Sequence, residues 1–160
     1  MRVLVTGGAG FIGARLVEEL LKTGDEVLVV DSFATSNRDR LTPVFAKYGP
    51  GSCDYVDITD LGRLEQWFVE NASGKPLDCV YHLAARASII PSVQNPQLYH
   101  NVNVTGTLNI LEMVRRYNIP RFVYAASGSC YGIPAELPTT ELCLVKPLYP
   151  YALAKWMGEQ

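Results

Sequence analysis

The chain has 160 residues, a hydrophobic content of 48%, a charged content of 19% and a formal net charge of −2. This length fits one domain with a buried core, and the near-neutral charge argues against the basic surface of proteins that bind nucleic acids or anionic membranes. No apolar run approaches the roughly 18–20 residues that span a bilayer, and no signal peptide precedes the first strand, so a cytoplasmic protein without membrane contact is expected.

The chain has four cysteines, Cys53, Cys79, Cys130 and Cys143. They show neither Cys-x-x-Cys spacing nor histidine partners, so we expect reduced thiols that pack in the core. The two histidines, His82 and His100, are isolated from each other in the sequence. We therefore expect no metal site.

A short apolar strand and a glycine turn open the chain. Residues 3–5 (VLV) predict a buried parallel strand, and TGGAGFIG follows at residues 6–13. Gly7 can make the tight turn, Gly10 lets a pyrophosphate approach the backbone, and Gly13 lets helix and strand pack closely. This Gly-x-x-Gly-x-x-Gly spacing is one residue longer than the standard dinucleotide form. The following helix offers its N-terminus to phosphates, and its expected apolar face comprises Phe11, Ile12, Leu16, Leu20 and Leu21.

The second strand, expected at residues 26–31, ends in a carboxylate. Asp31 lies 24 positions after Gly7, close to where a Rossmann unit places the acid that binds the ribose hydroxyls of adenosine. Because a carboxylate repels a 2′-phosphate, NAD is favoured over NADP. Arg38 lies near enough in the sequence to complicate this preference.

The rest of the chain alternates between strand and helix patterns, which predicts an α/β fold, a Rossmann-type doubly wound parallel sheet with right-handed crossovers. Small residues after the fourth strand, Ala84 and Ala85, leave room for a cofactor. Leu108, Leu111 and Met113, with Val114, are expected to form much of the apolar surface of a long helix. The expected strands are 54–58 (a strand together with its exit), 78–83 and 121–126. The expected helices are 38–48, one that carries Leu61, Leu64 and Phe68 (capped by Thr59 or Asp60), 101–117 and 149 onward, and the expected loops are 88–96 and 132–147.

Tyr151 and Lys155 are four residues apart on the last predicted helix and therefore share one face. A lysine ammonium beside a phenol favours the phenolate and lowers its pKa, so the pair can take a proton from a substrate hydroxyl. Ser127, after the fifth strand, could orient the same substrate oxygen. Alone, such a pair is common on surface helices; here it follows a dinucleotide fingerprint.

With these motifs the sequence resembles the amino-terminal half of an extended short-chain dehydrogenase/reductase of the nucleotide-sugar epimerase/dehydratase group. The resemblance covers essentially all 160 residues. It implies that residues 1–160 form an NAD-binding Rossmann domain, truncated before the carboxyl-terminal substrate region. The segments that carry it are TGGAGFIG (6–13), Asp31, Asp57-Ile58, HLAA (82–85), NVTGT (103–107 with Asn103 first), AASGSCYG (125–132) and YPYALAK (149–155).

The resemblance also implies a role for each matching residue. Tyr151 is the expected base, Lys155 its partner and a ligand of the cofactor ribose, and Ser127 the residue that orients the substrate hydroxyl. Asn103 would support the helix that carries this pair. Cys130 is expected to pack rather than to act as a nucleophile. The expected NAD-binding residues are Gly7, Gly10, Phe11, Ile12, Gly13, Asp31, Asp57, Ile58, Ala84, Ala85, Asn103, Tyr151 and Lys155, and the expected substrate-binding residues are Ser88, Ser127, Ser129 and Tyr149.

The residues after Ser127 favour one reaction within this group. Sugar 4,6-dehydratases carry an Asp-Glu pair there, whereas this chain has Gly128-Ser129, which cannot expel water. The serine-rich segment looks like that of UDP-hexose 4-epimerases, particularly those that accept N-acetylated sugars. Tightly bound NAD would oxidise C4 to a transient ketone and reduce it from the other face.

Two alternatives remain open at this point. UDP-glucuronate decarboxylases begin with the same C4 oxidation, and the chain could also be an NAD-binding fragment without catalysis. The expected partners are a UDP-sugar and, as in relatives of full length, a second copy in a homodimer.

Overall fold

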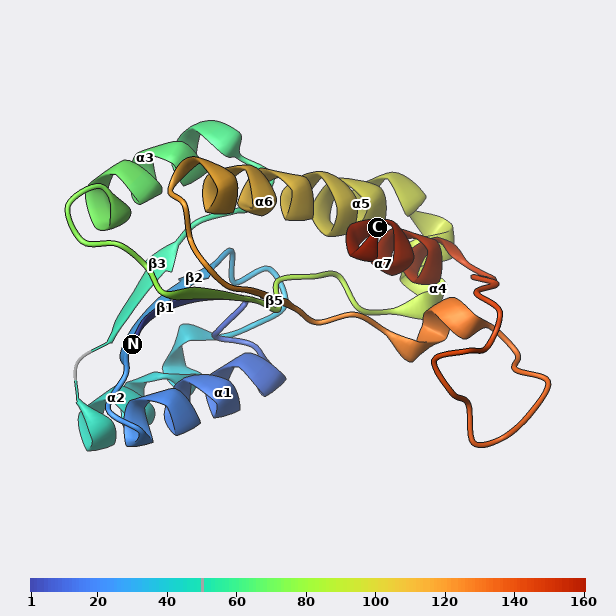
Figure 1. Cartoon of the computed structure of the whole chain (residues 1–160), viewed down its shortest axis with the longest axis horizontal. Helices are drawn as coiled ribbons and strands as arrows, with labels where there is room; N and C mark the ends of the chain where they lie inside the picture. The colour runs from blue at the N-terminus through green and yellow to red at the C-terminus, as the bar shows by residue number, and fades with distance from the viewer. Residues whose placement is uncertain (50) are drawn as a thin grey trace.

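The computed structural model describes residues 1–49 and 51–160. In these residues five parallel strands form one sheet in the order β3-β2-β1-β4-β5 (Figure 1). The predicted doubly wound parallel sheet is therefore confirmed. Because the order reverses direction after β1, the carboxyl ends of β1 and β4 border the crevice where ligands bind in open α/β sheets. The strands are β1 (Arg2–Thr6), β2 (Glu26–Asp31), β3 (Ser52–Tyr55), β4 (Cys79–His82) and β5 (Phe122–Tyr124).

Two helical layers cover the sheet, with α1 and α2 on one face and α3 and α6 on the other (Figure 1). Alternation along β1 sends Val3 and Val5 to the first face and Leu4 to the second, and all three are fully buried. The helices of these layers are α1 (Phe11–Lys22), α2 (Thr42–Tyr48), preceded by the 3₁₀ turn η1 (Arg38–Arg40), α3 (Leu61–Ala72) and α6 (Gly106–Arg116).

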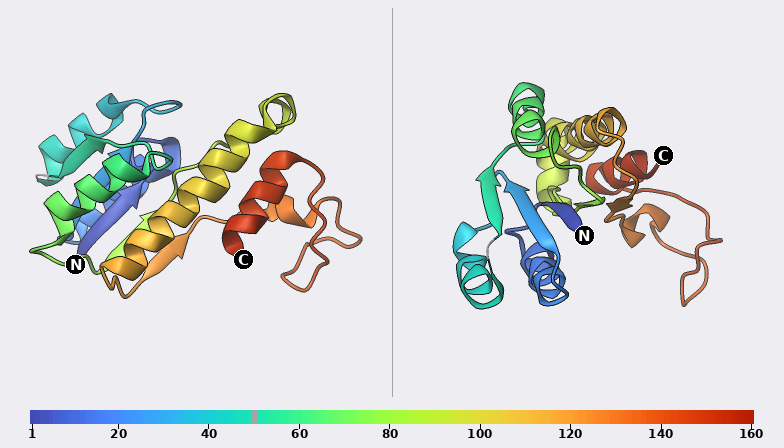
Figure 2. Two further views of the ribbon diagram at one scale, coloured as in Figure 1. Left: turned by 90° about the horizontal axis from the view of Figure 1, so that it is seen from above. Right: turned by 60° about the vertical axis from the view of Figure 1, so that its left-hand side comes forward.

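Beyond the carboxyl ends of the strands lies a further group of helices (Figure 2). One continuous helical segment passes through α5 and a π-helical turn into α6. In that turn the Gly106 N–H bonds the Asn101 carbonyl, five residues back. This group comprises α4 (Ile89–Gln94), α5 (Pro96–His100), the π turn η2 (Asn101–Thr105) and α7 (Pro150–Glu159), and the 3₁₀ turn η3 (Gly128–Tyr131) leads from β5 toward α7.

Several expected boundaries are wrong. β3 (Ser52–Tyr55) begins two residues earlier than expected, with Val56 to Ile58 as its exit, and β4 and β5 are shorter than expected. Residues 88–96, expected as a loop, contain α4, and the long helix begins at Pro96 rather than at residue 101. Of the two expected caps, the Asp60 carboxylate caps α3 by accepting from Arg63 N. Gly24, with a φ of +84°, follows the end of α1.

The apolar faces of two helices also differ from expectation. Phe11 is 88% exposed and Ile12 67%, and Val17 takes their place in the core. On α6, Leu108 and Leu111 are exposed, whereas Ile110 and Met113 are buried against the sheet.

None of the helices within the described ranges is long and apolar enough to cross a membrane. The four cysteines, all of them described, are free thiols; three are buried and Cys143 is half-buried.

Phe68 of α3 tests the packing of the second face. Its side chain is fully buried, with ring centroids 5.2 Å from Trp67 and 5.3 Å from Tyr117. Phe68→Ala should lower the free energy of unfolding by about 3–5 kcal/mol because it leaves a cavity. Val69→Ala on the same helix is the control: this side chain is 60% exposed, and its loss should change stability by less than about 0.5 kcal/mol. Urea titration measures both, and equal effects would contradict the burial of Phe68.

Candidate functional site

The glycine turn between β1 and α1 packs against backbone. Gly7 has a φ of +69°, and a Cβ there would lie 2.7 Å from the amide nitrogen of Ala84. A Cβ on Gly13 would overlap the carbonyl oxygen of Gly7 and lie 2.6 Å from Cα of Gly8. The turn therefore lies directly on the exit of β4, with no side chain between the two segments.

The carboxylate of Asp31 is held by three donors at the end of β2. Oδ2 accepts from Ala9 N (3.0 Å), and Oδ1 accepts from Phe33 N (2.9 Å) and Ser36 Oγ (2.7 Å). The residue is 8% exposed and contributes to the wall of a cavity. Because Oδ1 already accepts two hydrogen bonds, the remaining acceptor capacity for a ligand lies on Oδ2.

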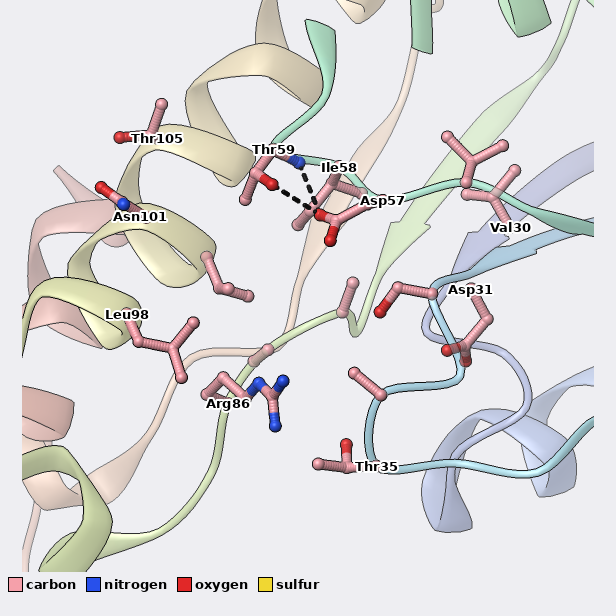
Figure 3. Close-up of a pocket in the computed structure, with 16 residues that line it drawn as sticks. Val30, Asp31, Thr35, Asp57, Ile58, Thr59, Arg86, Leu98, Asn101 and Thr105 are labelled. Carbon is pink, nitrogen blue, oxygen red and sulfur yellow. Dashed lines mark hydrogen bonds between the residues drawn. The ribbon is translucent and has the colours of Figure 1, made fainter. Parts of the chain in front are cut away.

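This first cavity, of about 440 Å³, runs along the exits of β2, β3 and β4 (Figure 3). Asp57 is fixed there because its Oδ1 accepts from both the backbone N (2.9 Å) and Oγ1 (2.8 Å) of Thr59. Besides Asp31, four of the expected cofactor residues line this cavity: Asp57, Ile58, Ala84 and Ala85. The residues that line the cavity are Val30, Asp31, Ser32, Ala34, Thr35, Val56, Asp57, Ile58, Thr59, Ala84, Ala85, Arg86, Leu98, Asn101, Val102 and Thr105.

A second cavity, of about 290 Å³, lies over the glycine turn and reaches α7. Ala85 lines both cavities, so the two meet at the exit of β4. The exposure of Phe11 and Ile12 has its explanation here, because both side chains form part of this wall. The lining residues are Gly7, Gly10, Phe11, Ile12, Gly13, Leu83, Ala85, Ala87, Ala125, Ala126, Tyr151 and Lys155.

At the far wall of the second cavity, Lys155 is 4% exposed and its Nζ lies 4.0 Å from the ring centroid of Tyr124. Burial lowers the pKa of Lys155 to about 8. Tyr124 donates its hydroxyl to the Lys155 carbonyl (3.0 Å), and burial raises the pKa of Tyr124 to about 12. Tyr124 therefore stays a neutral phenol that supports Lys155, whereas half-buried Tyr151 faces the cavity.

The expected substrate residues lie next to the two cavities but do not line them. Ser127 Oγ is 2.8 Å from Ser129 Oγ, directly after Ala126 of the second cavity. Ser88 is exposed at the start of α4, and Tyr149 caps α7, its ring 6.5 Å from that of Tyr151. Burial raises the pKa of the Cys130 thiol, which disfavours the thiolate that a nucleophile needs.

A buried polar chain through His82 has no counterpart in the sequence-based predictions. His82 is fully buried, with Nδ1 2.7 Å from Thr6 Oγ1 and Nε2 3.0 Å from Thr107 Oγ1. The Thr107 hydroxyl donates to the Asn103 carbonyl (2.8 Å), so it must accept from His82 Nε2–H. Nδ1 then accepts from Thr6, whose oxygen accepts from Ala84 N (3.2 Å).

This chain continues through Asn103, which is 1% exposed in the π turn. Its side-chain Oδ1 accepts from Arg86 N (2.8 Å) and its Nδ2 donates to the Arg86 carbonyl (3.0 Å). Its own carbonyl lies beside Gly158 of α7. The amide is therefore committed to the β4 exit, while the backbone of Asn103 contacts the helix that carries Tyr151. The one signal in the sequence for the contact between Asn103 and Arg86 is the position of Arg86 directly after HLAA.

The protonation of His82 gives a test of this network. Burial lowers the pKa of His82 to about 3, whereas an unfolded histidine titrates near 6.5. Between these values the unfolded chain binds a proton that the folded chain does not, so stability falls as pH decreases. From about pH 7.5 to about pH 5 the wild type should lose about 2 kcal/mol of unfolding free energy through this residue.

His82→Gln should lack this loss, and His100→Gln, which changes the exposed histidine, should keep it. Urea titrations of the three proteins at the two pH values measure the difference. An imidazole NMR signal of His82 that titrates near its ordinary pKa would contradict the buried neutral form.

Comparisons with known proteins agree with this geometry. Residues 3–160 match the NAD dependent epimerase/dehydratase family. The chain is 38% identical to a putative UDP-glucose 4-epimerase of Methanocaldococcus jannaschii over 99% of this chain and 48% of that protein. It superposes with a TM-score of 0.91 on UDP-glucose 4-epimerase from Bifidobacterium longum in complex with NAD⁺ and UDP (33% identity, 99% of this chain, 47% of that one).

The UDP-Glc/GlcNAc 4-epimerase of Campylobacter jejuni gives the same TM-score at 26% identity, over 99% of this chain and 46% of that one. The chain thus spans about half the length of the relatives it matches. With the family match over almost its whole length, the chain belongs to the NAD dependent epimerase/dehydratase family.

Proposed function

We propose that residues 1–160 form the NAD-binding Rossmann domain of a UDP-hexose 4-epimerase. The observation that supports NAD most is the pair of cavities joined at Ala85, with Asp31 and Asp57 on one side and Tyr151 and Lys155 on the other. A dinucleotide needs such a continuous groove, and the glycine turn lets a ligand approach the backbone closely because Gly7, Gly10 and Gly13 line the second cavity without side chains.

In this proposal each wall of the groove has a separate task. Asp31 Oδ2 accepts from the adenosine ribose, and Asp57 with Ile58 holds the adenine. Gly7, Gly10 and Gly13, with the α1 terminus at Phe11 and Ile12, receive the phosphates; Ala84 and Ala85 line the floor, and Asn103 acts through the β4 exit.

When bound, NAD supplies the oxidant for C4 of the sugar and later returns the same two electrons. Tyr151 takes the proton of the C4 hydroxyl as the base, and it gives the proton back when the ketone is reduced on its other face. The charge of Lys155 favours the tyrosinate. A lysine pKa of about 8 leaves much of this side chain cationic at neutral pH. Ser127, with Ser129 beside it, orients the hydroxyl, and Ser88 and Tyr149 contact the sugar nucleotide.

Gly128-Ser129 after the orienting serine supports epimerisation over dehydration, and the likeness to the Campylobacter jejuni enzyme supports a substrate range of UDP-glucose and UDP-N-acetylglucosamine. UDP-glucuronate decarboxylation and NAD binding without turnover are the alternatives that the assays below separate. A homodimer is supported by apolar side chains exposed on α6 and α7, Leu108, Leu153 and Met157. A cytoplasmic location remains part of the proposal.

Asp31 determines the cofactor in this proposal. Asp31→Ala should raise the Kd for NAD about tenfold or more, because a charge-assisted hydrogen bond to the ribose and the support of the β2 exit are both lost. Isothermal titration of the 160-residue chain with NAD and then NADP measures this. Asp39→Ala, an exposed carboxylate on η1, is the matched control and should leave the Kd unchanged. Binding of NADP as tight as that of NAD to the wild type would contradict the assigned role.

Tyr151 determines turnover. In a carboxyl-terminally extended version of the chain, Tyr151→Phe should keep the affinity for NAD but lower the rate of C4 inversion by at least about a hundredfold, since a general base contributes about that much. NMR of a UDP-glucose and NAD mixture reports UDP-galactose directly. An extended wild type that binds NAD yet inverts no sugar would contradict the epimerase proposal and favour the NAD-binding alternative, and release of carbon dioxide from UDP-glucuronate would favour the decarboxylase.

A further inference from the structure

Arg86 is held in place by its backbone, while its side chain extends into the first cavity. The Asn103 amide contacts both its N–H (2.8 Å) and its carbonyl (3.0 Å), and Asn103 itself is almost fully buried. Figure 3 shows the guanidinium group pointing toward the side of the cavity that Thr35 lines. The residue is half-buried. The fold therefore fixes where this cation enters the groove.

The charge of Arg86 has no counter-charge among the residues that the structure describes. Within residues 1–49 and 51–160, no carboxylate lies within salt-bridge distance of its guanidinium, and no other cationic side chain lines the first cavity. A half-buried guanidinium offers a planar fork of donors that matches the oxygens of a phosphate. The cavity is thus prepared for an anion at this position.

The position of Arg86 near the junction of the two cavities indicates which anion it would bind. Ala85 lines both, and Arg86 follows it on the side of the first cavity. A dinucleotide with its adenosine near Asp31 and its nicotinamide near Tyr151 must carry its pyrophosphate across this junction. We propose that Arg86 binds the adenosine 5′-phosphate of the cofactor, an inference that rests on the proposed NAD function.

Two other roles for the guanidinium make different predictions. Stacking on the adenine ring would act on adenosine as strongly as on its phosphates. Binding a 2′-phosphate would favour NADP, but the Asp31 carboxylate at the ribose end opposes that charge. The 5′-phosphate is therefore the partner to test.

The experiment compares the wild type with Arg86→Gln and Arg86→Lys by isothermal titration with adenosine, 5′-AMP, 2′-AMP and NAD. Arg86→Gln should weaken 5′-AMP and NAD about tenfold, the loss of one charge-assisted contact, and leave adenosine within about twofold. Arg86→Lys should be intermediate because it keeps the charge without the planar fork. Arg121→Gln, an exposed arginine that lines neither cavity, is the matched control and should bind as the wild type does.

The opposite results are equally clear. An equal loss for adenosine, a loss confined to 2′-AMP, or unchanged binding of 5′-AMP by folded Arg86→Gln would overturn this assignment while NAD binding by the wild type stands. A wild type that binds none of the four ligands would instead remove the proposed function, and the role of Arg86 with it. Circular dichroism confirms that each variant is folded.

Discussion

A buried imidazole joins the two halves of the site. His82 sits at the end of β4 and bonds Thr6 of β1 on one side and Thr107 of α6 on the other. Because the Thr107 hydroxyl donates a hydrogen bond to the Asn103 carbonyl, the donors in this chain all point one way. The side chains of Thr6, His82 and Thr107 each have partners although these residues are buried from water. The glycine turn, the β4 exit and the π turn are therefore positioned relative to one another by one set of hydrogen bonds.

Contacts between backbone atoms fix the shape of the groove built on this frame. Gly7 lies against Ala84, and the Asn103 amide spans Arg86, so that the four residues from Leu83 to Arg86 are held from both faces of the sheet. Asp31, Asp57 and Arg86 line the first cavity, and Tyr151 and Lys155 line the second.

The sequence predicted structure correctly where a local pattern of residues is compatible with one local structure. Continuous apolar runs in β1 and β2, the glycine spacing and the acid at residue 31 predicted both the sheet and most of the groove. Phe11 and Ile12 followed the helical period but face the cavity, because a ligand site and a core both favour apolar side chains. The helix α4 was missed because Pro91 and Pro96 resemble loop signals. The partners of His82 and Arg86 lie 17 to 76 residues away along the chain, beyond the reach of any local pattern.

The π turn sets the number of residues between two contacts that the α5–α6 helical segment makes around the site. It holds one residue more than a regular helix needs, and each residue turns an α-helix by about 100°. Tyr99 packs on Tyr151 before the turn, and Thr107 bonds His82 after it. A chain with one residue deleted from this segment would still form a helix, but it could satisfy only one of these two contacts. A homologous chain that lacks one residue between positions 99 and 107 should therefore lose either the contact of Tyr99 with Tyr151 or the hydrogen bond of Thr107 with His82.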